Sequence, residues 1–243
     1  MVHTILFFFY FWVSLVFSLL ICLPFGALML LGLEKRFRHG TQFFVRAWAR
    51  SVLAVAGVRV STKGLELIPD TPRLCFVANH QGDMDILLVL ACIERTVGFI
   101  AKKEALYIPI LNVWIAVLGS VFIDRKNAKK ALRSIERGAE KIRRGHAMIV
   151  FPEGTRSQSP RMGAFRGGSL KLATKAGATI VPVTIDGTWR IWEERKRISP
   201  TEVSFTVHGP IPTEGMGSDE RKLLAERVCA AIAAGLPSPA RPT

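Results

Sequence analysis

The amino-acid sequence predicts an α/β fold, with a mixed, largely parallel sheet flanked by helices and preceded by a membrane-anchoring helical segment. From Leu65 onward, short apolar runs of strand type alternate with stretches of helical periodicity, as is typical of parallel α/β sheets. Before them, the chain from Ile5 to Leu33 carries no formal charge. We therefore expect an anchor with an interfacial helix over residues 1–60, a globular domain over 61–215, and a C-terminal helix and tail over 216–243.

The N-terminal apolar run is longer than the roughly 20 residues that one membrane crossing needs. Pro24 and Gly26 lie inside it, so it forms either one tilted span or two shorter helices that enter one leaflet and return. A cleaved signal peptide is disfavoured, because no Lys or Arg precedes the run. The basic cluster that follows, Glu34 to His39, predicts an inner-membrane protein whose remaining chain faces the cytoplasm.

The stretch from Gln42 to Val60 mixes aromatic residues with Arg46 and Arg50. This pattern is typical of an amphipathic helix at the membrane interface, and it equally fits a helix with one face on the core.

Composition narrows the class of partner. The chain has 33 Lys and Arg against 19 Asp and Glu, a formal net charge of +14, which indicates an anionic partner. An apolar content of 49% favours an anionic membrane surface over nucleic acid. The four cysteines are scattered without a C-x-x-C pair, so neither a disulfide framework nor a zinc site is expected.

The globular part is expected to alternate strands and helices. The clearest helix is 128–144, in which Ala128, Leu132 and Ile135 mark one apolar face. A helix over 170–176 is expected to end at Gly177, a favourable C-cap residue. The remaining expected helices are 85–93 and 223–232, and the expected strands are 74–78, 97–101, 121–123, 147–151, 180–185 and 203–207.

Polar residues follow three of these strands directly: His80, Arg125 and Glu153. Ligands of open α/β sheets bind outside the carboxyl ends of the strands, so we expect these three residues to share one site.

The segment from Asn79 to Asp85 suggests a base. Asp83 can cap the next helix, which puts Asp85 in its first turn, within reach of His80. A carboxylate bound to one imidazole nitrogen fixes the tautomer and leaves the other nitrogen as a base for a substrate hydroxyl. A loop histidine followed by a structural capping aspartate is the alternative.

Three further segments complete the pattern. Phe151 to Ser157 supplies a carboxylate, a turn at Gly154 and an Arg156 fork suited to phosphate, although a surface turn with a structural Glu–Arg pair has the same sequence. Gly119 to Arg125 ends a strand on a second cation. In the apolar run Val181 to Val183, the proline predicts an edge strand or a bulge.

Together these segments resemble the glycerolipid acyltransferases, and specifically the bacterial lysophosphatidic acid acyltransferases. That family has a histidine followed after four residues by an aspartate, here His80 and Asp85. The other blocks follow in family order, over roughly residues 65 to 190: Gly119–Arg125, the complete Phe-Pro-Glu-Gly-Thr-Arg-Ser of 151–157, and Val181–Val183. One block is weak, but all four in order form a strong signal.

The resemblance implies roles and substrates. It makes 61–215 the catalytic domain, with His80 as the general base and Asp85 as its orienting carboxylate. The substrate-binding residues that it implies are Lys103, Arg125, Glu153, Gly154, Thr155, Arg156 and Pro182.

The implied reaction moves an acyl group from acyl-CoA or acyl-carrier protein to the sn-2 hydroxyl of lysophosphatidic acid. Another acceptor, such as lyso-ornithine lipid or another lysophospholipid, is the alternative. Membrane lipids are implied partners, whereas nucleic acid, a metal and a redox cofactor are not.

This chain departs from the family pattern at Gly82 and Asp83, where many members have a serine and an aromatic residue, which affects acceptor preference. Asn112 replaces a common glycine. Backbone amides near the start of the helix with Asp85 are one candidate for stabilising the oxyanion. A non-enzymatic basic protein leaves the ordered motifs unexplained, and a hydrolase would need a protein nucleophile or an activated water.

Overall fold

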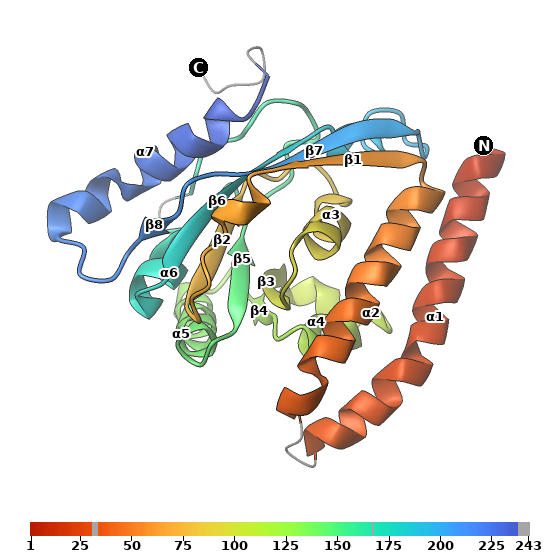
Figure 1. The fold of residues 1–243 in the computed structure, drawn as a ribbon, viewed down its shortest axis with the longest axis horizontal. Coiled ribbons are helices and arrows are strands. Elements are labelled where there is room, and N and C mark those ends of the chain that lie inside the picture. The colour runs from red at the N-terminus through yellow and green to blue at the C-terminus, as the bar shows by residue number, and fades with distance from the viewer. Residues whose placement is uncertain (31–33, 167, 238–243) are drawn as a thin grey trace.

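The computed structural model places one sheet between two layers of helices (Figure 1). It describes residues 1–30, 34–166 and 168–237, and of residues 21–30 and 34–39 the backbone alone. The side chains of Cys22 and of the cluster Glu34–His39 thus lie outside the described part of the structure.

The sheet is mixed and largely parallel, as the sequence predicts. Its strand order is β1-β7-β6-β2-β5-β3-β4, with β8 paired to β6. The antiparallel neighbours of β6 are β7 and β8, whereas the other paired strands run parallel. The bounds are β1 Val58–Lys63, β2 Leu74–Ala78, β3 Val97–Lys102, β4 Val121–Ile123, β5 Ala147–Val150, β6 Thr179–Asp186, β7 Thr201–Val207 and β8 Ile211–Pro212.

Helices cover both faces of this sheet. One layer holds α1 to α4 and the other holds α5 to α7, as the two core clusters show. The bounds are α1 Val2–Leu30, α2 Glu34–Val55, α3 Asp85–Cys92, α4 Leu111–Val117, α5 Ala128–Arg143, α6 Lys171–Ala176 and α7 Ser218–Ala234. Three short 3-10 helices are η1 Leu65–Leu67, η2 Lys103–Tyr107 and η3 Thr188–Arg190.

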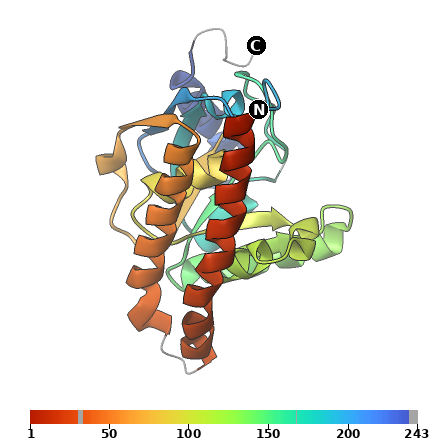
Figure 2. The ribbon, with the colours of Figure 1, turned by 90° about the vertical axis from the view of Figure 1, so that its right-hand side faces the viewer.

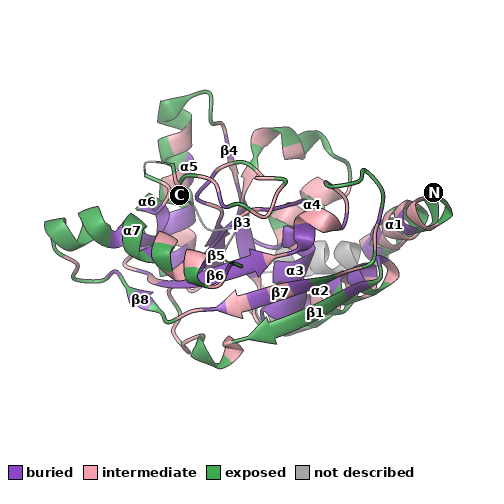
Figure 3. Ribbon diagram, turned by 90° about the horizontal axis from the view of Figure 1, so that it is seen from above, coloured by how far each residue is buried: buried purple, intermediate pink, exposed green. Residues whose placement is uncertain are grey.

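The central strands β2 and β5 are apolar throughout, and β6 is apolar from Ile180 to Val183, because both faces of the sheet are buried here (Figure 3). In β2, Phe76 packs on the side of α1–α4, while Cys75 and Val77 pack on the side of α5–α7. The edge strand β1 is mostly exposed. Because β2, β5, β3 and β4 run parallel, their carboxyl ends meet at one edge of the sheet.

The N-terminal segment differs from one of its two predicted forms. The backbone of α1 stays helical through Pro24 and Gly26, so the alternative of two helices inside the apolar run is wrong. The chain returns instead through α2, which lies beside α1 (Figures 1 and 2). Residues Val2–Leu20 are long and apolar enough to cross a membrane.

The stretch 42–60, predicted as a helix either at the membrane interface or with one face on the core, is helical only to Val55 and gives way to β1. Its arginines do not face outward, because Arg46 and Arg50 both donate to the carbonyl of Ala91 in α3. The predicted boundary after residue 60 therefore falls within a strand. At the other end, α7 buries Leu224 in the same core as α5 and α6.

Of the two positions predicted for Pro182, an edge strand or a bulge, the edge is wrong, because β6 lies inside the sheet. Pro182 is in register with Val77 inside β6, between the end of the β8 pairing at Ile180 and the start of the β7 pairing at Val183. The carbonyl of Pro182 accepts a hydrogen bond from the His208 N–H at 2.9 Å. The backbone polar groups of residue 182 therefore face the break between the two pairings. A proline is tolerated here because no ladder bond needs its missing N–H.

Candidate active site

The loop between β2 and α3 brings His80 and Asp85 together. Nδ1 of His80 lies 2.7 Å from Oδ2 of Asp85, the hydrogen bond that the sequence predicts. The Asp85 side chain is fully buried, and the imidazole stacks on Phe151 with ring centroids 4.1 Å apart. With Nδ1–H donating to the carboxylate, Nε2 is left to accept a proton.

Asp85 is itself held by its surroundings. Its Oδ2 accepts the backbone N–H groups of Gln81 at 2.7 Å and Gly82 at 3.1 Å, while its Oδ1 accepts the hydroxyl of Thr188. These amides are therefore committed to a carboxylate, and the expectation that they stabilise an oxyanion is not supported.

Thr188 and the side chains of Asn79 and Gln81 also belong to this network, although the sequence did not predict a part for them. Asn79 both donates to and accepts from the backbone of Ile185 at 2.8 Å, and Oε1 of Gln81 accepts the N–H of Gly187 at 2.8 Å. These bonds fix the loop that carries His80 to the end of β6. The only signal for this role in the sequence is that Asn79 and Gln81 lie on either side of His80.

Glu153 joins the two motif loops. It is buried, and its carboxylate accepts the N–H of His80 at 2.7 Å and that of Gly163 at 2.7 Å. The N–H of Ser157 in turn donates to the His80 carbonyl at 2.8 Å. Burial raises the pKa of Glu153 above its usual value, against the lowering effect of these two backbone hydrogen bonds. The Glu153 carboxylate thus sets the position of the His80 backbone.

Two arginines meet at the turn after Glu153. Arg125 donates to the carbonyl of Gly154, and Nε of Arg166 donates to the carbonyl of Glu153 at 3.0 Å. Desolvation, and then the positive charge of Arg166, lowers the pKa of Arg125 below its usual value. Arg166 follows the 151–157 motif by nine residues and was not predicted from the sequence. Two guanidinium groups this close form a natural binding site for an anion.

Gly154 permits the close approach of the Arg166 side chain to this turn. Its φ is +70°, and a Cβ at this position would lie 2.7 Å from Nε of Arg166.

The other predicted substrate-binding residues are placed differently. Arg156 pairs with Asp83, which therefore does not cap α3 as predicted. Lys103 pairs with Asp124 at 2.9 Å. Thr155 is exposed beside Arg156, whereas Pro182 is buried in the sheet. The structure thus unites His80, Asp85, Glu153, Gly154 and Arg125, and it places Pro182 outside this group.

Glu193 is a buried carboxylate that the sequence did not single out, because the charged run around it resembles a surface segment. Its Oε1 accepts the N–H of Asp83 at 2.8 Å and lies 3.6 Å from Nη1 of Arg156. Its Oε2 is buried without a hydrogen-bond partner in the described structure, and a Cβ at Gly82 would lie 2.7 Å from it. Gly82 thus provides the space that the Glu193 carboxylate occupies.

The Glu193→Gln variant is expected to gain stability over the wild type as the pH rises. Burial raises the pKa of Glu193, so the unfolded chain loses this proton at a lower pH than the folded protein. The contribution of Glu193 to stability is complete below its unfolded pKa and is lost as the pH rises through its folded pKa. Denaturant unfolding at several pH values measures the difference, with the exposed Glu226→Gln as control. A difference that does not change with pH would contradict this assignment.

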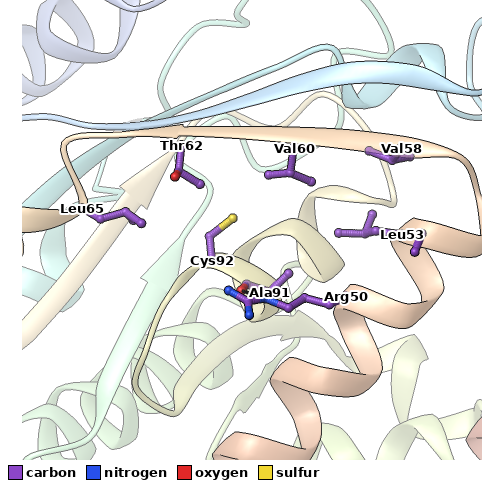
Figure 4. Close-up of a pocket in the computed structure, with 9 residues that line it drawn as sticks. Arg50, Leu53, Val58, Val60, Thr62, Leu65, Ala91 and Cys92 are labelled. Atoms are coloured by element: carbon purple, nitrogen blue, oxygen red, sulfur yellow. Dashed lines mark hydrogen bonds between the residues drawn. The ribbon is translucent and has the colours of Figure 1, made fainter.

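A separate cavity lies between β1, α2 and α3 (Figure 4). Its volume is about 350 Å³, and Leu53, Val58 and Leu65 contribute an apolar lining together with Arg50 and Cys92. Burial raises the pKa of the Cys92 thiol to about 12, so the thiol stays protonated and is unsuited to act as a nucleophile. None of the candidate site residues lines this cavity.

Comparison with known proteins identifies the class. The family model described as Acyltransferase matches residues 59–186, more than half of the chain. The match starts in β1 and ends with the last residue of β6, so it includes both motif loops. The chain is thus an acyltransferase by class.

Comparison with individual proteins shows which acyltransferases this chain is similar to. A crystal structure of the 1-acyl-sn-glycerophosphate acyltransferase PlsC from Thermotoga maritima superimposes with a TM-score of 0.84 and 31% identity, over 96% of this chain and 93% of that one. A Pseudomonas aeruginosa 1-acyl-sn-glycerol-3-phosphate acyltransferase is 33% identical over 152 residues, 60% of this chain and 58% of that protein. A chloroplast homologue from Arabidopsis thaliana is 31% identical over 182 residues, 73% of this chain and 49% of that protein.

The chain belongs to the 1-acyl-sn-glycerol-3-phosphate acyltransferase family, which confirms the resemblance found in the sequence. It spans about half the length of the first curated relatives that it matches.

Proposed function

We propose that this protein transfers an acyl group from acyl-CoA or acyl-carrier protein to the sn-2 hydroxyl of lysophosphatidic acid, which gives phosphatidic acid. The observation that carries the proposal is the 2.7 Å hydrogen bond between His80 and the buried Asp85, beside the paired arginines Arg125 and Arg166. The printed names of the relatives describe the same acceptor.

In the proposed mechanism, Nε2 of His80 removes the proton of the lysolipid hydroxyl as its oxygen attacks the thioester carbonyl. The carbonyl carbon becomes tetrahedral, and its collapse breaks the carbon–sulfur bond. The imidazolium then returns the proton to the departing thiolate. Asp85 stabilises the transient positive charge on the ring. A positioned base contributes about 10²–10⁴-fold, and alignment of the two substrates contributes more.

The phosphate of the acceptor is proposed to bind Arg125 and Arg166. Their guanidinium groups lie at one turn, next to the residue that holds the His80 backbone. Arg156 is assigned a secondary contact, because Asp83 and Glu193 already surround it. Lys103, which is paired with Asp124, is proposed to contribute to the positive field at the edge of the site.

The N-terminal helix is proposed to bind the inner membrane from the cytoplasmic side. Its outward face is apolar, with Phe9 and Phe17 exposed by 67% and 65%. Its inward face contacts the globular domain at two points, since Phe8 packs on Trp192 and the Trp114 ring nitrogen donates to the Ser18 hydroxyl. Because these contacts fix one face of the helix on the globular domain, burial of its other face in one leaflet is favoured over a full crossing.

An Arg125→Ala variant is expected to raise the KM for lysophosphatidic acid about tenfold or more, because a charge-assisted phosphate contact is lost. The same variant should change the KM for phosphate-free lyso-ornithine lipid much less. A panel of labelled acyl donors with both acceptors and other lysophospholipids measures this, with the exposed Arg59→Ala as control. Preference of the wild type for lyso-ornithine lipid would instead support the alternative acceptor, and an equal loss on both acceptors would remove Arg125 from phosphate binding.

A further inference from the structure

A wide groove runs along α5 beside the edge strand β4. We define the α5 groove by Lys103 and Asp124 at one end, the exposed α5 residues Lys130, Arg133 and Arg137, and the β4 residue Phe122. Its volume is about 1050 Å³. Its three α5 cations belong to no motif, whereas Phe122 and Asp124 lie in the Gly119–Arg125 block, and neither His80 nor Asp85 lines it.

The acidic residues of the α5 groove are already neutralised. Asp124 pairs with Lys103, Glu136 pairs with Arg143 and Lys175, and Glu140 pairs with Arg143 and Arg144. In the part of the chain that the structure describes, no carboxylate lies within ion-pair distance of the three exposed α5 cations. These cations therefore give the groove an uncompensated positive charge.

The spacing of these cations determines the shape of the positive surface. Lys130, Arg133 and Arg137 follow one another at intervals of three and four residues, so they lie on one face of α5. At 1.5 Å per residue they extend over roughly 10 Å. A line of charges along a helix matches an acidic helix of a partner protein better than it matches the compact phosphates of a nucleotide.

The location of the α5 groove favours a soluble acidic protein over an anionic membrane as its partner. The exposed apolar residues of α1 lie in the helical layer on one face of the sheet, whereas α5 lies on the other face (Figures 1 and 3). A bilayer that binds α1 therefore lies on the far side of the sheet from these cations. A soluble acidic protein is free to reach them.

One end of the groove is next to a residue of the candidate site in the chain. Asp124 at its end directly precedes Arg125, whose guanidinium donates to the carbonyl of Gly154 in the site. A carrier bound in the groove would hold a flexible thioester arm near the loop of His80.

We propose that the α5 groove docks the acidic carrier protein that presents the acyl thioester. The proposal rests on the acyltransferase function proposed above and adds the place where the donor binds. The cations of α5 steer and orient the carrier, and the acyl group then reaches His80 on its arm.

The test reverses the three charges in Lys130→Glu, Arg133→Glu and Arg137→Glu together. A matched control, Arg221→Glu, Lys222→Glu and Arg227→Glu on α7, makes the same change from +14 to +8 in the formal net charge. Each full-length protein is assayed at low salt with lysophosphatidic acid and the same acyl chain on acyl-carrier protein or on CoA. Binding to anionic vesicles is measured in parallel.

The α5 triple variant is expected to raise the KM for acyl-carrier protein about tenfold or more and to leave the KM for acyl-CoA within about twofold. The control should leave both values within about twofold. An equal change with both donors, no change with either, or a loss of vesicle binding with α5 reversed would overturn the docking site. A wild-type enzyme inactive with both donors would overturn the proposed function instead.

Discussion

Replacing His80 with alanine is expected to lower kcat by about 10²–10⁴-fold, the usual contribution of a general base. In the structure, no other side chain takes its place opposite the Asp85 carboxylate, whose Oδ2 bonds only to His80 Nδ1 and two backbone amides among the described residues. The lysolipid hydroxyl would then have to attack the thioester without a positioned base.

Two measurements separate loss of chemistry from loss of structure in this variant. Flotation with anionic vesicles and the thermal unfolding midpoint should both match the wild type, because α1 and the core do not depend on the imidazole. His146→Ala is a suitable control. His146 directly precedes β5, whereas Glu153 follows β5, so the two residues lie at opposite ends of this strand. Wild-type turnover by purified His80→Ala would falsify the proposed mechanism.

The sequence predicted the elements whose pattern is local. The strands 74–78 and 121–123 and the C-cap at Gly177 agree with the structure residue for residue. Apolar runs and glycine signals determine these elements within a few residues, so no tertiary information was needed. The largely parallel sheet followed from their alternation.

The errors arose where tertiary contacts decide the outcome. The edge strand β1 was missed because its exposed residues alternate weakly and pair only with β7, about 140 residues later. For Pro182 the sequence left an edge strand and a bulge both open, because the break between the pairings with β8 and β7 is not visible in the local sequence.

In the candidate site, too, the local features were predictable from the sequence and the tertiary contacts were not. The approach of Asp85 to His80 follows from a spacing of five residues and was predictable. Arg166 and Glu193 were not, because Arg166 reaches Glu153 only through the fold-back of the loop between β5 and α6, and the partner of Glu193 lies in a distant loop. A buried carboxylate in a charged run has no distinguishing signal until its surroundings are known.

Changing Asp85 to asparagine is expected to lower kcat by about 10²-fold or more while the protein stays folded. The amide oxygen can replace Oδ2 as the acceptor for His80, Gln81 and Gly82, and the amide NH₂ can donate to the Thr188 hydroxyl. Packing and hydrogen bonding are therefore preserved. Only the negative charge that stabilises the imidazolium is removed.

Asp85→Ala separates this charge from the structural role of the carboxylate. Alanine leaves the N–H groups of Gln81 and Gly82 and the Thr188 hydroxyl without their buried acceptor, and each such loss costs about 1–3 kcal/mol. Denaturant unfolding should thus show a large destabilisation for alanine and a small one for asparagine. Single-turnover assays should show a large fall in rate for both. An asparagine variant that keeps kcat within about threefold would mean that the charge of residue 85 is not used in the reaction and that its role is structural.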